Sequence, residues 1–301
     1  MGDSIVTALA FGGTVRITAA ITTETVGTAA QLHALMPVTS AALGRSLTGV
    51  ILMSNMLKND SDKITFQIKG DGPLGGLLVT GDRFANVKGY VNNPNCDLPV
   101  RNGEGGDGKL DVSGAVGNGY LQVIKDIGLK EPYIGMVNLV SGEIAEDLTY
   151  YFAVSEQINS AIGLGVLVNP DNSVAKSGGY MIQLLPGADE ECISFLEKRF
   201  AYLPSVVSLI GDLADSTSEE KAKSLIEKIF EKESIEFLET KPCGYVCGCS
   251  KEKMEKNLIT IGVKDLEELA EEKQTELLCH FCNSKYIFSS AEILDLIKSI
   301  T

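Results

Sequence analysis

The chain has 301 residues, of which 44% are hydrophobic, and it contains 31 Gly, seven Cys, only two His and no Trp. This length predicts two domains, each long enough to bury a hydrophobic core. The formal net charge of −14 disfavours a protein that binds nucleic-acid phosphates, and two histidines leave little room for histidine-based catalysis.

The composition of the chain changes about two-thirds of the way along. Residues 216–301 contain 17 Asp or Glu, 12 Lys and only three Gly, whereas the remaining 28 Gly lie before them. A glycine-rich, weakly charged body is therefore followed by a charged, helix-prone tail. We predict a core domain over residues 1–188, a helical linker over 189–238 and a small C-terminal domain over 239–301.

The body is predicted to consist mostly of strands. Polar and apolar residues alternate over 14–18 and 64–69, as expected of half-buried strands. Further short β-rich runs, bounded by Gly, Pro, Asn or Asp, lie at residues 76–80, 86–91, 121–127, 163–169 and 178–185.

One segment of the body has helical spacing instead. Residues 40–58 follow the turn residues Pro37 and Thr39 and place apolar side chains on nearly every side of a helix. We therefore expect this helix to be buried between two sheets. The predicted fold class is α+β, with β-sheets enclosing helices in sheet/helix/sheet layers.

The linker is predicted to be helical. Residues 190–212 form an amphipathic segment that Pro204 interrupts, and Ser216 with Glu219 predicts a capping box. Apolar residues then recur at helical spacing, opposite a face of Glu and Lys: Ala222, Leu225, Ile226, Ile229 and Phe230. This helix is either simply packed on the body or a detachable segment whose docking is part of a switch.

The cysteines are concentrated near the C-terminus. A C-x-C pair and a C-x-x-C pair are separated by 29 residues and consist of Cys247, Cys249, Cys279 and Cys282. The sequence predicts a helix starting near Ser250 and another over 265–272, with residues 275–278 and 285–288 flanking the second pair as a hairpin. Two tight turns that aim thiolates at one point are typical of a zinc knuckle.

The physical setting favours a metal over structural disulfides. No stretch approaches the roughly 18 consecutive apolar residues of a membrane span, and the N-terminus lacks the pattern of a secretory signal. We therefore expect a cytoplasmic protein with no membrane partner, in which thiols stay reduced. Residues 239–301 are short of core, and zinc bound by four thiolates supplies about 10–16 kcal/mol of folding free energy. We predict one Zn²⁺ per chain on these four cysteines, rather than reduced cysteines scattered in a helical tail.

The C-x-C pair also predicts redox sensitivity. A disulfide across one intervening residue closes a small, strained ring, and strained disulfides are readily reduced. Zinc keeps the sulfurs as thiolates, which are the oxidisable form. Such a site can release its metal and lose its fold in one event, as expected of a sensor rather than a catalyst.

The remaining cysteines and one histidine are weaker candidates. Cys243 can compete as a ligand with either cysteine of the C-x-C pair, but a fifth thiolate exceeds tetrahedral capacity, so we interpret it as a bystander. His280 could be a ligand only by displacing a cysteine. Cys96 and Cys192 stand alone and are predicted to be ordinary small hydrophobic residues.

Two glycine-rich segments do not predict a nucleotide site. Residues 103–109 fit G-x-x-x-x-G-K, but Leu110 stands where a P-loop needs Ser or Thr. Glu104 and Asp107 in this segment would also repel phosphates. Residues 70–76 are more plausible as a turn that leads into a strand.

The sequence resembles the family of 33-kilodalton heat-shock proteins, which are redox-regulated bacterial holdase chaperones. The resemblance covers essentially the whole chain, and the C-x-C and C-x-x-C arrangement is its most specific element. The body motifs that carry it are ALGR at 42–45, GPLG at 72–75, KGYV at 88–91, LVSGEIAED at 139–147, GLGVLVNP at 163–170 and QLLPGA at 183–188. Cys243 is not part of the family pattern.

The resemblance implies a mechanism without enzymatic activity. In the reduced state the four cysteines bind zinc and the chaperone is idle. Oxidants such as peroxide or hypochlorite, together with unfolding stress, join Cys247 to Cys249 and Cys279 to Cys282. Zinc then leaves, the C-terminal domain and the linker unfold, and the protein dimerises and holds unfolding client proteins without ATP.

Two other function classes remain as alternatives. A zinc-ribbon nucleic-acid module is disfavoured by the net charge of −14 and by the absence of Arg after Arg199. A thiol oxidoreductase is disfavoured because its C-x-x-C would normally open a helix in a βαβ setting.

Overall fold

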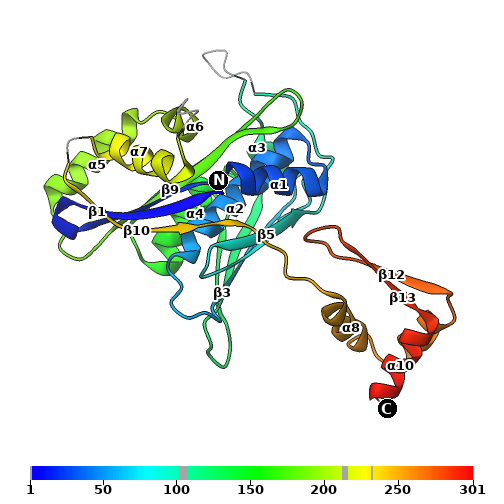
Figure 1. Cartoon of the computed structure of the whole chain (residues 1–301). Helices are drawn as coiled ribbons and strands as arrows, with labels where there is room; N and C mark the ends of the chain where they lie inside the picture. Colours follow the sequence, from blue (N-terminus) through cyan, green and yellow to red (C-terminus); the bar gives the residue numbers. More distant parts are fainter. Residues whose placement is uncertain (1, 102–107, 212–215, 232, 301) are drawn as a thin grey trace. The chain divides into compact units, whose positions relative to one another are not determined.

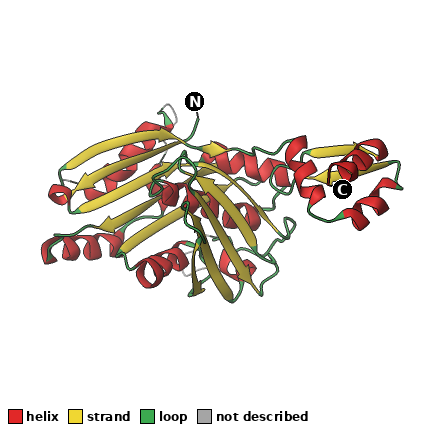
Figure 2. Ribbon diagram, turned by 90° about the horizontal axis from the view of Figure 1, so that it is seen from below, coloured by secondary structure: helices red, strands yellow, loops and turns green. Residues whose placement is uncertain are grey.

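The computed structural model describes residues 2–101, 108–211, 216–231 and 233–300. The chain divides into two compact units, Met1–Tyr245 and Val246–Thr301, here called unit 1 and unit 2. Figures 1 and 2 show that unit 1 combines sheets with helices, and that unit 2 contains a short hairpin with helices beside it. This mixture confirms the predicted α+β class.

Unit 1 contains a five-stranded antiparallel sheet, here called the first sheet. Its strand order is β10-β1-β2-β9-β8, so segments from both ends of unit 1 lie side by side. The strands are β1 (Ser4–Ala10), β2 (Val15–Ile21), β8 (Ser160–Val168), β9 (Val174–Leu184) and β10 (Ile235–Pro242). Alternate side chains enter different cores: Ile5 faces one core, whereas Val6 and Ala8 face another. Both faces of this sheet are therefore covered.

A second sheet of six strands completes unit 1. Its order is β11-β5-β4-β3-β6-β7, and every neighbouring pair is antiparallel except β11 with β5. The strands are β3 (Lys63–Gly70), β4 (Leu77–Asp82), β5 (Asn86–Val91), β6 (Gly119–Asp126), β7 (Tyr133–Asn138) and β11 (Gly244–Tyr245). The strands predicted from alternation and from the short β-rich runs all correspond to strands of the two sheets.

Helix α2 (Pro37–Ser54) lies between the two sheets. It contacts β8 and β9 of the first sheet and β3, β4 and β5 of the second, and every residue after Pro37 is buried. The predicted enclosed helix is therefore confirmed. Neither α2 nor any other helix in the described part of the chain is long and apolar enough to cross a membrane.

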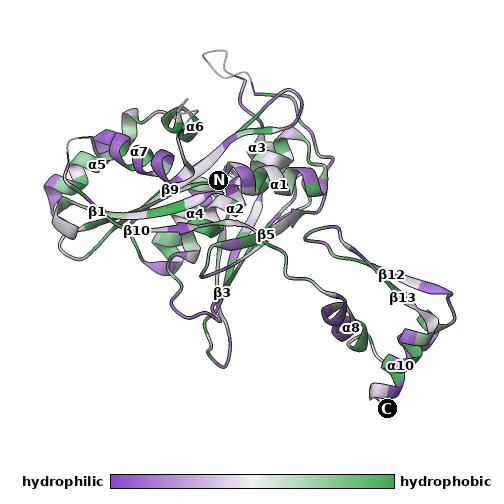
Figure 3. Ribbon diagram, in the orientation of Figure 1, coloured by the Kyte–Doolittle hydropathy of each residue, from purple (hydrophilic) through white to green (hydrophobic). Residues whose placement is uncertain are grey.

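A layer of helices covers the other face of the first sheet. It consists of α5 (Glu190–Tyr202), α6 (Val206–Ile210) and α7 (Ser218–Phe230), and the break between α5 and α6 lies at the predicted Pro204. Figure 3 shows α5 and α7 with hydrophilic and hydrophobic residues interspersed, as expected of amphipathic helices. The five predicted apolar residues of α7 are all buried: Ala222, Leu225, Ile226, Ile229 and Phe230.

The capping box of α7 lies one residue later than predicted. Thr217 adopts an extended backbone conformation and its hydroxyl accepts from the backbone N–H of Glu220, while Glu220 Oε2 accepts from the backbone N–H of Thr217 at 2.7 Å. Ser216 and Glu219 offer the same spacing in the sequence. The prediction was wrong in register because only the tertiary position of the helix selects between the two pairs.

The end of the predicted linker forms part of the first sheet. Strand β10 pairs along β1 from Ser4 with Pro242 to Ala10 with Ile235. Unit 1 therefore extends to Tyr245, beyond residue 239, where the sequence places the start of the C-terminal domain. The reason is that β1 offers an open edge that these residues complete.

Several elements of unit 1 were not predicted. Besides β1, β7, β10 and β11, they are the helices α1 (Thr23–His33), α3 (Val112–Val116) and α4 (Ala145–Tyr151) and the short helical turns η1 (Phe11–Gly13) and η2 (Phe152–Glu156). Most of these elements are short, so they span few repeats of any hydrophobic period.

Unit 2 has the predicted helices and hairpin. It contains α8 (Lys251–Ile259), α9 (Val263–Ala270), the antiparallel strands β12 (Gln274–Leu278) and β13 (Lys285–Ser289), and an unpredicted C-terminal helix α10 (Ser290–Ile300). Its core of buried residues is small and consists of Leu258, Leu266, Phe288 and Ile293.

The close packing of α2 generates a stability prediction. A Cβ atom at Gly44 would lie 2.6 Å from Val26 Cγ1 and 2.9 Å from Val166 Cγ2, and neither branched side chain can rotate away freely. Gly44→Ala should therefore lower the free energy of unfolding by about 1–3 kcal/mol. Gly27→Ala in α1 is the matched control, because nothing lies within 4 Å of the added Cβ; it should raise stability by up to ~1 kcal/mol. Urea unfolding midpoints measure both, and an unchanged midpoint for Gly44→Ala would contradict the packing argument.

Candidate metal centre

The C-x-C pair lies in the turn that leads into α8. The Ser250 side chain caps this helix by accepting from the backbone N–H of Lys253. Lys253 also donates from Nζ to the carbonyl oxygen of Gly248, between the two cysteines. The backbone N–H of Cys249 is directed at the Cys247 sulfur. Local hydrogen bonds thus hold the turn that carries the two cysteines.

The C-x-x-C pair forms the turn between β12 and β13. The backbone N–H of Cys279 donates to the carbonyl of Ser284 at 3.0 Å, and that of Asn283 donates to the carbonyl of Cys279 at 2.8 Å. Asn283 has a positive φ of 55°, which Asn tolerates better than most residues. The hairpin therefore closes in a tight turn with both thiols on it.

The two turns bring all four sulfur atoms together. The ligand atoms of Cys247, Cys249, Cys279 and Cys282 all lie within 4.8 Å of one another. Cys247 Sγ is 3.7 Å from Cys279 Sγ, and Cys249 Sγ is 3.3 Å from Cys282 Sγ. With Zn–S bonds of about 2.3 Å, the sulfurs of a regular tetrahedron lie about 3.8 Å apart. The cluster therefore has the donor set and the size to hold one metal ion.

Backbone N–H groups also favour the thiolate form of the sulfurs, which is the form that binds a cation. Amide N–H groups of Phe281 and Cys282 point at the Cys279 sulfur, and the N–H of Ser284 points at the Cys282 sulfur. Donors directed at sulfur stabilise thiolates, which are the form that binds metal. Burial disfavours the Cys282 thiolate, but the hydrogen bonds with Ser284, Cys249 and Cys247 together outweigh it and lower the thiol pKa to about 7.

The environment of Cys247 differs from that of Cys282. Burial, together with the neighbouring thiols, raises the pKa of Cys247 to about 12. Taking such a sulfur into a four-thiolate cluster requires a nearby positive charge, which is what a divalent cation supplies.

Tyr286 is a partner of the cluster that the sequence analysis missed. Its hydroxyl donates to Cys249 Sγ at 3.0 Å, and this hydrogen bond is the main reason that the Tyr286 pKa rises to about 12. Tyr286 lies on β13, in register with Leu277 on β12. In the sequence, only its position four residues after the last cysteine points to this role. The contact between its hydroxyl and the C-x-C turn depends on the tertiary structure.

The structure places the other thiols elsewhere. Cys243 is buried in unit 1, where its thiol lies 3.8 Å from the carbonyl oxygen of Ile21, and burial strongly raises its pKa. Cys96 and Cys192 are buried in the two cores of unit 1, as predicted, and burial raises the pKa of both. His280 is exposed on the C-x-x-C turn.

The glycine-rich segments show no phosphate-binding arrangement in the described residues. Residues 103–107 of the segment 103–109 lie outside the described residues, so only its last two residues, Gly108 and Lys109, are described. Residues 70–76 form the turn between β3 and β4, as predicted.

Comparisons with known proteins agree with this architecture. The family model described as Hsp33 protein matches residues 3–289. The chain belongs to the Hsp33 family. It is 52% identical to a 33 kDa chaperonin of Ruminiclostridium cellulolyticum, over 99% of both chains, and 48% identical to one of Acetivibrio thermocellus, over 100% of this chain and 98% of the other. The crystal structure of the 33 kDa chaperonin of Thermotoga maritima has a TM-score of 0.87 at 36% identity and covers 100% of this chain and 99% of its own.

Membership of the Hsp33 family has two direct consequences. The protein is a chaperone with a place in the stress response, and it is not an enzyme. The resemblance stated from the sequence is thereby confirmed at the level of family and chaperone function.

The sulfur cluster predicts how metal content depends on each cysteine. Ser replacement of Cys247, Cys249, Cys279 or Cys282 should reduce bound zinc well below one per chain, because three thiolates leave the tetrahedron open. Cys243→Ser is the control and should keep one zinc, since that thiol is buried in unit 1. Zinc measured by mass spectrometry on protein purified under reducing conditions tests both. Loss of zinc from Cys243→Ser would show that the ligand set is wrong.

Proposed function

We propose that this protein is a redox-regulated, ATP-independent holdase chaperone of the cytoplasm that binds unfolding client proteins under oxidative stress. The observation that carries the proposal is the cluster of four sulfurs in an Hsp33-family chain. We propose that these functions are divided among the predicted core domain (1–188), linker (189–238) and redox-switch domain (239–301).

The four clustered cysteines are proposed to hold one Zn²⁺ in the reduced state. The buried core of unit 2 has only four residues, so the unit has little hydrophobic free energy with which to fold. A bound zinc ion would join the two cysteine turns and hold the sulfurs as thiolates. The stability of unit 2 is then set by the oxidation state of its cysteines.

Oxidation is proposed to join Cys247 to Cys249 and Cys279 to Cys282, as the family resemblance implies. In each pair one thiolate attacks a peroxide oxygen and releases hydroxide, giving a sulfenic acid. The second thiolate then displaces another hydroxide to form the disulfide, and two solvent protons convert both hydroxides to water. Each peroxide thus accepts two electrons. The oxidised cysteines no longer hold a metal, and unit 2 loses its main source of stability.

The helices α5 and α7 are the proposed moving part. Arg199 on α5 donates to the carbonyl oxygens of Lys228 and Ile229 and pairs with Glu231 at 2.7 Å, so the two helices are tied together. β10 connects the end of α7 to the residues before the cysteines. Unfolding of unit 2 would free one end of this segment and weaken its docking on the first sheet.

Release of α7 would expose a large apolar surface. Leu225, Ile226, Ile229 and Phe230 are each 0% exposed while α7 is docked. An uncovered surface of this kind suits binding of unfolded clients and of a second subunit, which gives the oxidised homodimer.

The two alternative classes gain no support from the site. The C-x-x-C pair lies in a hairpin turn rather than at the start of a helix, which disfavours a thiol oxidoreductase. The net charge of −14 still opposes a nucleic-acid module. Turnover of a disulfide substrate or salt-dependent RNA binding would favour one of these classes instead.

Metal and fold should be coupled in unit 2. Zinc removal combined with peroxide oxidation should abolish amide-exchange protection over residues 246–301, whereas α2 and the strands β2, β3, β4 and β9 of unit 1 should stay protected. Hydrogen exchange resolved by peptide measures this. Unchanged protection of unit 2 after zinc removal would show that its small core suffices and would refute the coupling.

Chaperone activity should depend on oxidation. Oxidised protein should suppress the aggregation of a heat-unfolded client without ATP, and reduced zinc-loaded protein at the same concentration should not. Light scattering of the client measures both forms. Equal suppression by the two forms would contradict the redox switch.

The double variant Ile226→Ser, Phe230→Ser should give partial activity when reduced, because it weakens the docking of α7. Glu227→Ser, on the exposed side of the same helix, should give no activity when reduced.

A further inference from the structure

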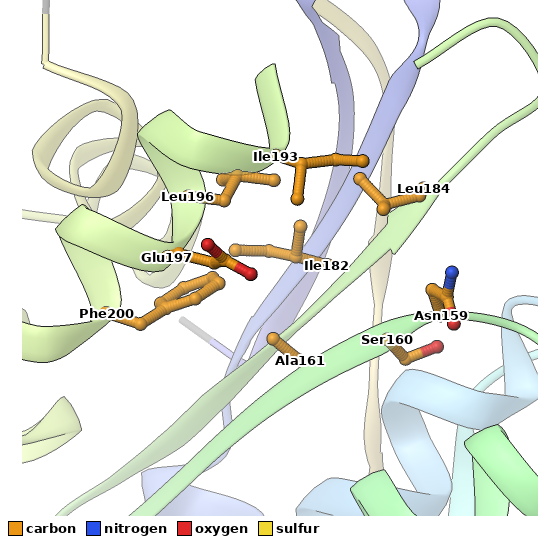
Figure 4. Close-up of a pocket in the computed structure, with 9 residues that line it drawn as sticks. All are labelled: Asn159, Ser160, Ala161, Ile182, Leu184, Ile193, Leu196, Glu197 and Phe200. Atoms are coloured by element: carbon orange, nitrogen blue, oxygen red, sulfur yellow. The ribbon is translucent and has the colours of Figure 1, made fainter. Parts of the chain in front are cut away.

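A pocket lies between the first sheet and α5. It has a volume of about 150 Å³. Ile182 and Leu196 are buried, whereas Ile193 is exposed, so the pocket has a buried floor and a rim that reaches solvent. A cavity of about this size with apolar walls accepts one benzene-sized group. Figure 4 shows the apolar walls, which come from Ala161, Ile182, Leu184, Ile193, Leu196 and Phe200.

The pocket joins α5 to the sheet. Four of its lining residues recur at i, i+3, i+4 and i+7 along α5, so they share one face of the helix: Ile193, Leu196, Glu197 and Phe200. The facing wall comes from β8 and β9, where Ala161 pairs with Ile182. A group inside the pocket therefore contacts the helix and the sheet at the same time.

Helix α5 is held on the sheet by little apolar burial of its own. Only Cys192 and Leu196 of its 13 residues are buried, whereas α7, which has the same length, buries five. Apolar surface removed from water stabilises in proportion to its area. A ligand that fills the pocket would thus add apolar contact where α5 has little.

The pocket has a single charged lining residue. The side chain of Glu197 extends from α5 toward the pocket beside Phe200 in Figure 4, and within the described residues it has no ion pair. Glu197 is exposed, so its carboxylate lies at the solvent side of the pocket. The chain as a whole carries a net charge of −14, so its electrostatic field adds to this local preference for a cation.

We propose that this pocket binds a small organic amine. A compact aromatic or branched apolar group fills the space between the sheet and α5, and the ammonium group lies beside Glu197. The volume accommodates one such group, which fits a small molecule. Only docked α5 completes the pocket, so the bound amine stabilises the docked helix. Its effect on chaperone activity rests on the proposed function, in which α5 undocks when unit 2 unfolds.

Binding to the reduced, zinc-loaded full chain tests the proposal. The probe is 2-phenylethylamine, and the matched ligands are 2-phenylethanol without charge, 3-phenylpropionate with the opposite charge and ethylamine without the ring. Labelled isoleucine methyl groups of Ile182 and Ile193 report binding in an NMR titration. The amine should bind about threefold more tightly than the alcohol, because an ion pair with an exposed carboxylate is weak. Phenylpropionate should bind less tightly than the alcohol, and ethylamine should leave the signals unchanged.

Three variants of the protein locate the binding. Glu197→Gln should bind the amine no more tightly than the alcohol and leave the affinity for the alcohol unchanged. Glu191→Gln is the matched control, because Glu191 is exposed on the same helix but does not line the pocket, and it should keep the threefold preference. Ala161→Leu fills the pocket and should abolish binding of both ligands. Equal binding of the amine and the alcohol to the wild-type protein, or equal effects of the two Glu variants, would overturn the proposal.

Amide exchange tests whether the amine holds α5. At ten times its dissociation constant, the amine should raise the protection of the α5 amides about tenfold, because undocking of the helix must first release the ligand. Ethylamine at the same concentration should have no effect, and β3 and β4, which do not line the pocket, should be unchanged with either ligand. Unchanged protection of α5 with the phenyl amine bound would overturn the proposal.

A second copy of the chain is the other possible occupant, and sedimentation distinguishes it. The wild-type protein should sediment identically with and without the amine. Conversion of a dimer to a monomer by the amine would place the pocket in an interface between copies and overturn the proposal. Every arm uses reduced protein, so failure here leaves the aggregation assay of the redox switch unaffected. Failure of that assay would leave the amine site standing and remove only its effect on activity.

Discussion

The mutual approach of four cysteine sulfurs is the constraint on which unit 2 depends. Sulfurs within 4.8 Å of one another, with backbone amides aimed at them, are stable as thiolates only beside a positive charge. The hydrophobic core of unit 2 has four buried residues in the part of the chain that the structure describes, so packing contributes little to its stability. Under the proposed function, such a domain would respond to the oxidation state of its sulfurs, as expected of a sensor.

In unit 1, the packing of the outer helix α7 depends on the neighbouring strand β10. β10 pairs with β1, and α7 packs on β1 and β2, so strand and helix share the same part of the first sheet. The face under α7 is apolar and completely covered. Both α7 and β10, the strand that follows it, lie in the chain between the other strands of the first sheet and the cysteines. Under the proposed function, α7 and β10 would lose support at one end when unit 2 loses its metal.

The two edge strands of the first sheet, β10 and β8, differ in residue composition. Glu, Lys and Pro on β10 discourage another strand from pairing, while β8 carries small and apolar residues only.

The sequence by itself determined the features that repeat locally. The spacing of Cys247, Cys249, Cys279 and Cys282 identified the cluster, and helical periodicity identified the buried α2 and the covered face of α7. Only the tertiary structure decided the rest. The pairing of β10 with β1, the burial of Cys243 in unit 1, the contact of Tyr286 with Cys249 and the edge position of β8 all join segments that are distant in the chain or set by the hairpin fold. Local patterns report which side of an element is apolar, but they do not report which distant segment covers it.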